Sequence, residues 1–362
     1  MTTSRPQILK YEDAPLKHIV VKGNAYDRGF THGAEAKSQI IKNIDFYLKY
    51  CVEYLKHDKA SVLKDVSKLR APIESFDSEI LQEMNGIADG AGVSLEEIMA
   101  VNARYELTKR SPECTAAAIL PEASSSNHTL LAQNWDLYPQ VENSCIILEI
   151  RRTDRPNILT HTEAGVIGRM GMNSNGVGLV HNALRSSLDE FANKEGLFHV
   201  LLRGILDSKT IGEGLEKAMN SKRAFSFNFL LGHAEGEAID VEFSPRKCNF
   251  IHPDDGVIVH TNHFLNGTVG FEDNITMPDT LLRYQRAKRL LKPRGIDSDR
   301  LKSVFKDHFN YPNSLCRHED SRKSEYEHVK TCASIIMDLN ERKTLITKGT
   351  PCNNSYHEFT LN

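Results

Sequence analysis

The hydrophobic pattern changes at Cys114, and this change constrains the fold more than any other feature of the chain. Before it, apolar residues recur every three or four positions over 34–57 and 95–107, which is typical of amphipathic helices. After it, β-compatible residues predominate and alternate with a period of two, beginning with 115–120. Pro112 disfavours helix for the residue before it, so the helical part is expected to end there.

The rest of the chain predicts short strands with two pairs of helices among them. The Asn175-Gly176 step predicts a hairpin, whereas the glycine-punctuated stretch 23–33 predicts a turn without a nucleotide-binding role. No long linker divides the chain, so one layered α+β unit is expected. The expected strands are 129–134, 145–151, 158–162, 225–232, 238–243, 257–261, 331–339 and 343–347, and the expected later helices are 197–207, 212–220, 280–291 and 299–309.

The composition argues against two classes of partner. The formal net charge of −3 comes without any basic run, so nucleic-acid binding is not expected. No apolar stretch approaches the roughly 20 residues that span a bilayer, and the N-terminus lacks the apolar centre of a secretory signal. Seven cysteines at irregular spacing do not form a disulfide framework. These features predict a cytoplasmic protein with reduced thiols.

The residues around Cys114 leave two interpretations open. A cysteine at the head of a strand can be an ordinary core thiol, or a nucleophile that becomes a chain terminus. No Cys-x-x-Cys pair and no His-Glu-x-x-His motif is present, so no metal site is expected, and His32, His260 and His263 are interpreted as structural. The remaining cysteines are interpreted as non-catalytic thiols: Cys51, Cys145, Cys248, Cys316, Cys332 and Cys352.

A set of motifs in one order resembles the acyl-coenzyme A:6-aminopenicillanic acid acyltransferases. Each motif is weak alone, but together they span roughly residues 23–348 and are specific. They are Glu113-Cys114-Thr115-Ala116-Ala117, Gln133-Asn134-Trp135-Asp136, Thr162-Glu163-Ala164-Gly165-Val166-Ile167-Gly168, Asn173-Ser174-Asn175-Gly176-Val177 and Val259-His260-Thr261-Asn262-His263, with a weaker match at Tyr311-Pro312-x-Ser314-x-Cys316-Arg317.

This resemblance implies an N-terminal-nucleophile hydrolase with a four-layer αββα sandwich. In that family a precursor cuts itself on the amino side of the cysteine. The resemblance therefore implies a helical α-subunit of residues 1–113 and a β-rich β-subunit of residues 114–362, which stay together as a heterodimer. The implied boundary coincides with the change of hydrophobic period.

The resemblance also implies roles for particular residues. It makes Cys114 the nucleophile and places Asn262 in the oxyanion hole. It places Asp136 in the cleft, where Asp136 would hold the substrate or the amine of Cys114. Ser226 matches a serine that is linked to processing.

The implied chemistry has a physical basis. Before cleavage the Cys114 thiol would attack the carbonyl of Glu113, giving a thioester that water opens. A free α-amine has a pKa of roughly 7.7 to 8.0, so the new amine of Cys114 can act as the base, directly or through water. The mature enzyme would take an acyl group from an amide or thioester and pass it to water or to an amine. No cofactor is expected, and an acyl-CoA is one candidate co-substrate.

Two positions depart from the family pattern. Glu113 stands where the penicillin-forming member has glycine, and its charge is expected to slow or pH-tune cleavage. His328 stands where that member has an arginine for the substrate carboxylate, which makes His328 a candidate substrate-binding residue and speaks against a penicillin-nucleus substrate. Two alternatives stay open at this point: an uncleaved chain that binds a small acyl or amine ligand, and an uncleaved Cys-His enzyme.

Overall fold

The computed structural model describes residues 16–108, 113–189, 197–266, 277–292 and 294–361. Their named strands form two sheets, one with the order β1-β4-β5-β6-β7-β8-β9-β10 and one with the order β11-β2-β3-β12-β13-β14. The first contains β1 (Lys17–Val21), β4 (Cys145–Ile150), β5 (Ile158–Glu163), β6 (Gly171–Asn173), β7 (Val177–Ala183), β8 (Phe227–His233), β9 (Glu237–Phe243) and β10 (Cys248–Ile251). The second contains β11 (Val257–His260), β2 (Cys114–Ile119), β3 (Leu130–Leu137), β12 (Lys330–Asp338), β13 (Lys343–Ile346) and β14 (His357–Thr360).

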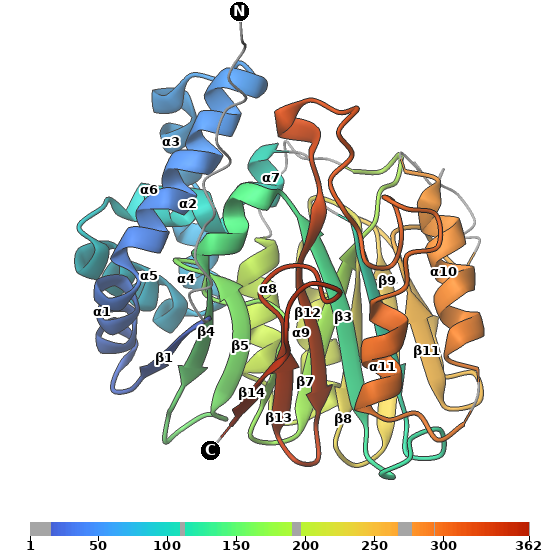
Figure 1. Ribbon diagram of the computed structural model, residues 1–362. Helices are drawn as coiled ribbons and strands as arrows, with labels where there is room; N and C mark the ends of the chain where they lie inside the picture. Colours follow the sequence, from blue (N-terminus) through green and yellow to red (C-terminus); the bar gives the residue numbers. More distant parts are fainter. Residues whose placement is uncertain (1–15, 109–112, 190–196, 267–276, 293, 362) are drawn as a thin grey trace, which may run out of the picture.

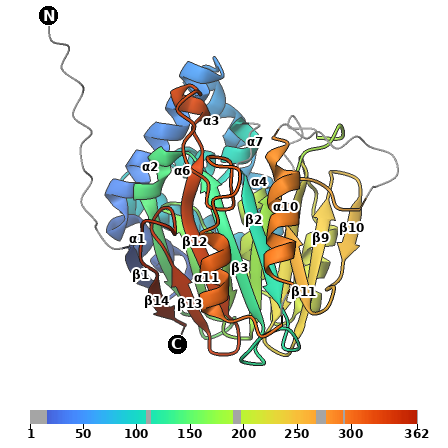
Figure 2. The same cartoon turned by 45° about the vertical axis from the view of Figure 1, so that its right-hand side comes forward.

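Helices cover the outer faces of these two sheets (Figure 1, Figure 2). The helices on the side of the eight-stranded sheet are α1 (Ala25–Glu35), α2 (Lys37–Lys49), α3 (Lys59–Ser67), α4 (Arg70–Phe76), α5 (Ser78–Ala91), α6 (Leu95–Asn102), α7 (Arg104–Thr108), α8 (Phe198–Leu206) and α9 (Ile211–Asn220). Residues of α2 to α9 share one buried apolar cluster with this sheet, whereas α1 packs on α5 and β1. The six-stranded sheet packs against α10 (Asp279–Leu290) and α11 (Ser298–Phe305). No helix in the described ranges is both long and apolar enough to cross a membrane.

The buried apolar residues divide into three clusters, one at each interface between neighbouring layers. The period of two along β2 shows how one strand serves two of them. Ala116 and Ala118 lie in the core between the two sheets, whereas Ala117 and Ile119 lie in the core beneath α10 and α11. Three interfaces require four layers, so the predicted α+β, αββα sandwich is confirmed.

The stretch 23–33 is not a turn, which corrects the prediction made from its glycines. It forms most of helix α1, which begins after Asn24 and packs along α5. A Cβ built on Gly29 would lie 1.9 Å from a backbone oxygen of α5, and one built on Gly33 would lie 2.3 Å from another. Gly86 of α5 is equally tight against α1. These glycines therefore allow two helix backbones to approach closely.

The predicted helix-to-strand junction lies where β2 begins, at Cys114 itself. The expectation for Pro112 falls outside the described residues, as does the N-terminal segment 1–15. The helical first third is joined to the later sheet by more than helix packing, because β1 pairs in parallel with β4. Figure 1 shows this arrangement, with the blue helices of the first third on the side of β1 and β4.

Candidate functional site

Strand pairing brings Cys114 and Asn262 together. Cys114 opens β2, which lies between β3 and β11 in its sheet. Strand β11 ends at His260, which is paired with Ala116, so the residues that follow β11 lie beside the start of β2. The side chain of Asn262 accepts a hydrogen bond from the backbone N–H of Cys114 at 2.8 Å.

The other contacts of Asn262 fix its orientation. Its Oδ1 also accepts from Arg283 at 3.0 Å, while its Nδ2 donates to the carbonyl of Ala183 at 3.0 Å. Two donors face Oδ1 and one acceptor faces Nδ2, so the amide is not interchangeable with its flipped form. One Nδ2 hydrogen is not engaged by Ala183. The oxyanion role of Asn262 stays a prediction that this hydrogen could fulfil.

The peptide bond between Glu113 and Cys114 is held at both of its polar atoms. Its N–H donates to Asn262, and its carbonyl oxygen accepts from the backbone N–H of Asp136 at 3.1 Å. The second bond extends the ladder between β2 and β3 by one position. The same bond is therefore fixed in direction by a strand on one side and by a side chain on the other.

Arg283 contacts residues on both sides of this peptide bond. Its guanidinium donates to the carboxylate of Glu113, and to the carbonyl of Cys114 at 2.7 Å. It also donates to Thr115 Oγ1 at 3.1 Å and to Asp279 at 3.0 Å. Arg283 is 2% exposed, so these charge-assisted bonds form away from water, where they are strong.

A second buried arginine, Arg317, extends this set of charges. Its guanidinium pairs with Asp279, lies 3.5 Å from Asp136 Oδ2 and 3.7 Å from the Glu113 carboxylate. The other oxygen of Asp136 accepts from Thr331 Oγ1 at 2.6 Å. The two arginines thus meet three carboxyl groups, and together they form the arginine–carboxylate cluster: Glu113, Asp136, Asp279, Arg283 and Arg317.

Burial sets the protonation of the groups nearest the peptide bond. It raises the pKa of Asp136 to about 7, against the opposing charges of Arg317 and Arg283. Burial likewise raises the pKa of Glu113. The Cys114 thiol is 1% exposed, and burial together with the charge of Asp136 raises its pKa to about 12. The thiol of the intact chain is therefore protonated at neutral pH and needs a proton acceptor to become a nucleophile.

A very small apolar pocket of about 10 Å³, room for about one water molecule, adjoins Cys114. His181 also lines it, and burial lowers the pKa of this imidazole well below its usual range, so the ring is neutral at pH 7. The remaining wall is one methyl group and four aromatic rings, from Ala183, Tyr105, Phe198, Phe225 and Phe227. This lining matches an apolar group in chemistry, but the side chains would have to move apart to admit one on the sulfur.

Ser226 and His328, both suggested by the sequence, occupy different surroundings. Ser226 is fully buried, and its hydroxyl donates to Asp189 at 2.6 Å and meets Ser186 at 2.9 Å. His328 hydrogen-bonds the carbonyl of Lys323 at 3.0 Å and lies 3.4 Å from Glu319. These contacts do not include the arginine–carboxylate cluster, and the roles of Ser226 in processing and of His328 in substrate binding stay predictions.

Neither of the two arginines is indicated as a site residue by the pattern of the sequence. Arg283 is one of several basic residues on α10, so its burial could not be read from the pattern. Arg317 ends the motif Tyr311-Pro312-x-Ser314-x-Cys316-Arg317, which assigns it no role. Its neighbour in that motif, Cys316, is also buried. The signal that could have indicated Arg317 is its position directly after Cys316, an apolar residue in an otherwise polar loop.

Comparison of the chain with known proteins shows which family it belongs to. Residues 123–353 match the family model described as acyl-coenzyme A:6-aminopenicillanic acid acyl-transferase. The acyl-coenzyme A:6-aminopenicillanic-acid-acyltransferase 40 kDa form of Emericella nidulans is 30% identical over 349 residues, which cover 96% of each chain.

Similar solved structures are more distant. A variant of conjugated bile acid hydrolase from Clostridium perfringens is 14% identical, with a TM-score of 0.47, and the match covers 69% of this chain and 97% of that one. Penicillin V acylase from Agrobacterium tumefaciens is 13% identical, with a TM-score of 0.44, over 65% of this chain and 83% of that one. The family match and the full-length relative decide the assignment: the chain belongs to the acyl-coenzyme A:6-aminopenicillanic acid acyltransferase family.

Proposed function

We propose that this family member is a self-processing enzyme that cuts its own chain between Glu113 and Cys114 and then uses Cys114 as an N-terminal nucleophile. The observation that carries the proposal is that both polar atoms of this peptide bond are hydrogen-bonded. Its N–H is held by Asn262 and its carbonyl by the N–H of Asp136. A donor on the carbonyl oxygen is what a tetrahedral intermediate needs when charge develops there.

Maturation would proceed in two balanced steps. The sulfur of Cys114 bonds to the carbonyl carbon of Glu113, the thiol proton passes to the peptide nitrogen, and the C–N bond breaks to leave a thioester and a free amine. Water then adds to the thioester carbon and the C–S bond breaks, which restores the thiol and leaves a new α-carboxyl group on Glu113. The carboxylate of Asp136, with a pKa of about 7, is suited to relaying the proton in the first step.

In the mature enzyme Asn262 Oδ1 would accept from the new amine of Cys114, as it now accepts from the peptide N–H. That amine would take the thiol proton while the sulfur attacks an amide or thioester carbonyl. The aromatic side chains beside Cys114 would move apart to receive an apolar acyl group on the sulfur. Water or an amine then takes the acyl group, which makes the protein a hydrolase or an acyltransferase. We expect no cofactor, and we propose an acyl-CoA as one donor.

Ser226 would affect self-cleavage indirectly, by holding the turn that contacts Asn262. Its carbonyl accepts from the N–H of Leu184, and its hydroxyl is bonded to Asp189, so it holds both ends of the turn that follows β7. That turn begins beside Ala183, whose carbonyl accepts from the Asn262 amide. We propose that Ser226 keeps Asn262 aligned with the peptide bond.

Intact-mass analysis of the purified protein tests the proposal. Wild type is expected as two fragments, with the larger one beginning at Cys114, whereas Cys114→Ala is expected as one full-length chain. The two wild-type fragments should elute together in gel filtration, since we propose that they form a heterodimer. A wild-type chain that stays intact and still turns over acyl substrates would show that the mechanism is wrong.

One observation favours a second function. Arg283 binds both the carboxylate of Glu113 and the carbonyl of Cys114, and so holds the residues on either side of the peptide bond in place. If these contacts prevent cleavage, the chain would bind a small acyl or amine ligand without turnover. A single full-length wild-type chain with no catalysis on a panel of acyl substrates would support this alternative.

A further inference from the structure

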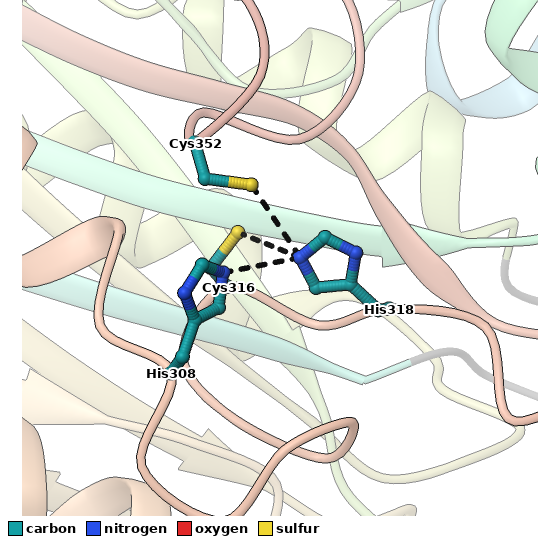
Figure 3. Close-up of side chains that lie close together, drawn as sticks. All are labelled: His308, Cys316, His318 and Cys352. Atoms are coloured by element: carbon teal, nitrogen blue, oxygen red, sulfur yellow. Dashed lines mark hydrogen bonds between the residues drawn. The ribbon is translucent and has the colours of Figure 1, made fainter.

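Four potential metal ligands converge away from Cys114. They are His308, Cys316, His318 and Cys352, and their ligand atoms all lie within 4.8 Å of one another. The first three come from the loop after α11, and Cys352 comes from the turn after β13. Figure 3 shows all four side chains pointing to one centre. We call them the thiol–imidazole cluster.

The separations within the thiol–imidazole cluster fit a tetrahedral zinc ion. His308 Nε2 lies 3.1 Å from His318 Nε2. The sulfur atoms of Cys316 and Cys352 lie 3.6 and 3.4 Å from the same nitrogen. With Zn–N near 2.0–2.1 Å and Zn–S near 2.3 Å, a tetrahedron requires N···N of about 3.3 Å and S···N of about 3.6 Å. The measured distances already lie close to this shell.

Hydrogen bonding alone is a poor account of this arrangement. His318 Nε2 carries either one hydrogen or one lone pair, yet three polar atoms approach it. It can bond well to one of them. A cation at the common centre would accept a lone pair from every member of the cluster instead.

We propose that His308, Cys316, His318 and Cys352 bind one Zn²⁺ ion. Two thiolates and two imidazoles are a ligand set that zinc prefers, and four protein ligands make a closed, structural site without an open position. On binding, the two thiols release two protons and the imidazoles stay neutral, so the complex carries no net charge. The sequence did not suggest this site because Cys352 is distant in the chain from the other ligands.

The ion would hold the loop that carries Arg317. Cys316 and His318 flank this arginine, whose side chain reaches Asp279 and Asp136. The backbone N–H of Arg317 donates to Thr331 Oγ1 at 2.9 Å, and that hydroxyl donates to Asp136. Zinc would therefore join the turn that contains Cys352 to the loop after α11. It would also hold Arg317 of the arginine–carboxylate cluster in position. The zinc proposal does not depend on self-cleavage.

Metal content of the full chain tests the proposal, with Cys114→Ala as the parent so that the proposed nucleophile cannot bind metal. The parent is expected to retain about one zinc per chain after gel filtration. Adding Cys352→Ser or His318→Ala should reduce this to less than about a tenth. Cys248→Ser is the matched control, since Cys248 is also a half-buried thiol, and should retain the zinc. Cobalt in place of zinc should give the charge-transfer absorption of a thiolate complex.

A second measurement covers variants that do not fold. The folded parent is treated with a chelator, and thiols are alkylated with and without added zinc. Zinc should protect Cys316 and Cys352 and leave the reaction of Cys248 unchanged. A parent without zinc, equal zinc in Cys352→Ser, or a mass lower by two hydrogens from a disulfide between Cys316 and Cys352 would each overturn the proposal.

Discussion

Cys114 and Cys316 are both buried thiols on the six-stranded side of the molecule, and they differ in what surrounds them. Cys114 begins a strand, and its backbone is held by Asn262 and Arg283. Cys316 lies in a loop, and its sulfur faces the His318 imidazole. Polar groups bind the backbone of both residues, since Ser314 Oγ donates to the Cys316 carbonyl. The sulfur atoms differ: that of Cys114 meets the side-chain amide of Gln133, whereas that of Cys316 meets an imidazole.

This difference separates two uses of one side chain. A nucleophile requires a sulfur that can bond to carbon, and mostly apolar side chains line the small pocket beside Cys114. A metal ligand requires several donors aimed at one point, as at Cys316. Burial is the same for both thiols, at 1% and 0% exposure, so burial alone does not distinguish a reactive cysteine from a ligand.

The strongest test of this contrast compares Cys114→Ala with Cys316→Ser. Removing the proposed nucleophile should lower kcat on an acyl substrate by roughly four or more orders of magnitude. Removing a proposed zinc ligand should act only through Arg317 and lower kcat by about tenfold, while the zinc is lost. Steady-state kinetics and metal content on the same samples measure both effects. Equal losses of activity in the two variants would contradict the distinction.

The next largest effect is expected at Asn262. Asn262→Ala leaves the Cys114 nitrogen without its side-chain partner and removes the proposed oxyanion donor, so the rate of acyl transfer should fall by about 10²–10³-fold. Asn175→Ala is a matched control on an exposed turn and should be close to wild type. The zinc content should be unchanged in both. If Asn262→Ala cleaves and turns over normally, the site does not work through this residue.

The smallest effect concerns pH and stability in the uncleaved Cys114→Ala chain. Burial raises the pKa of Asp136 to about 7, so the folded state retains a proton that the unfolded state loses near pH 4. The stabilisation is therefore present at low pH and is lost as pH rises from about 4 to about 7. Adding Asp136→Asn should flatten this slope, by at most about 1.4 kcal/mol per pH unit.

Other buried carboxyl groups contribute to that slope with the same sign. Burial raises the pKa of Glu106 to about 7, that of Asp240 to about 6, and those of Glu113 and Asp189 above their usual values. All four are present in both variants, so the difference between the two denaturation curves reports Asp136 together with its interaction with Glu113. Urea unfolding across pH 4 to about 7 gives the measurement, and identical slopes would show that Asp136 is not protonated in the folded chain.

The sequence predicted the layers of this fold well because they depend on periodicity. The period of two predicted a strand over 115–120, and in the structure Ala116 and Ala117 lie on its opposite faces. The order of the motifs supported the αββα class. Residues 23–33 were misread because glycine has two uses, turning the chain and allowing close contact, and only the partner helix α5 distinguishes them. The short edge strands β10 and β14 were not predicted. Each has four residues and no fully buried face, so its sequence shows no clear alternation of apolar and polar residues.

The candidate site was predictable only in part. Cys114 and Asn262 could be selected from motifs, and strand pairing then brought them together. Arg283 was not selected because its burial results from the packing of α10 across the sheet, which no local pattern records. The thiol–imidazole cluster was not visible for a similar reason. Its ligands meet only after the loop following α11 folds over the turn that contains Cys352.

If the chain cuts itself as we propose, the position of β2 determines whether folding or cutting comes first. Cys114 lies inside the molecule, on a strand with neighbours on both sides. Most chain ends form on the surface, but an amine at this position would be created in the interior, after the core has closed. Folding should therefore come first and cutting second. A fragment synthesised with Cys114 as its first residue would have to bury a charged end while it folds, so separately made fragments should reassemble far less efficiently than the intact chain matures.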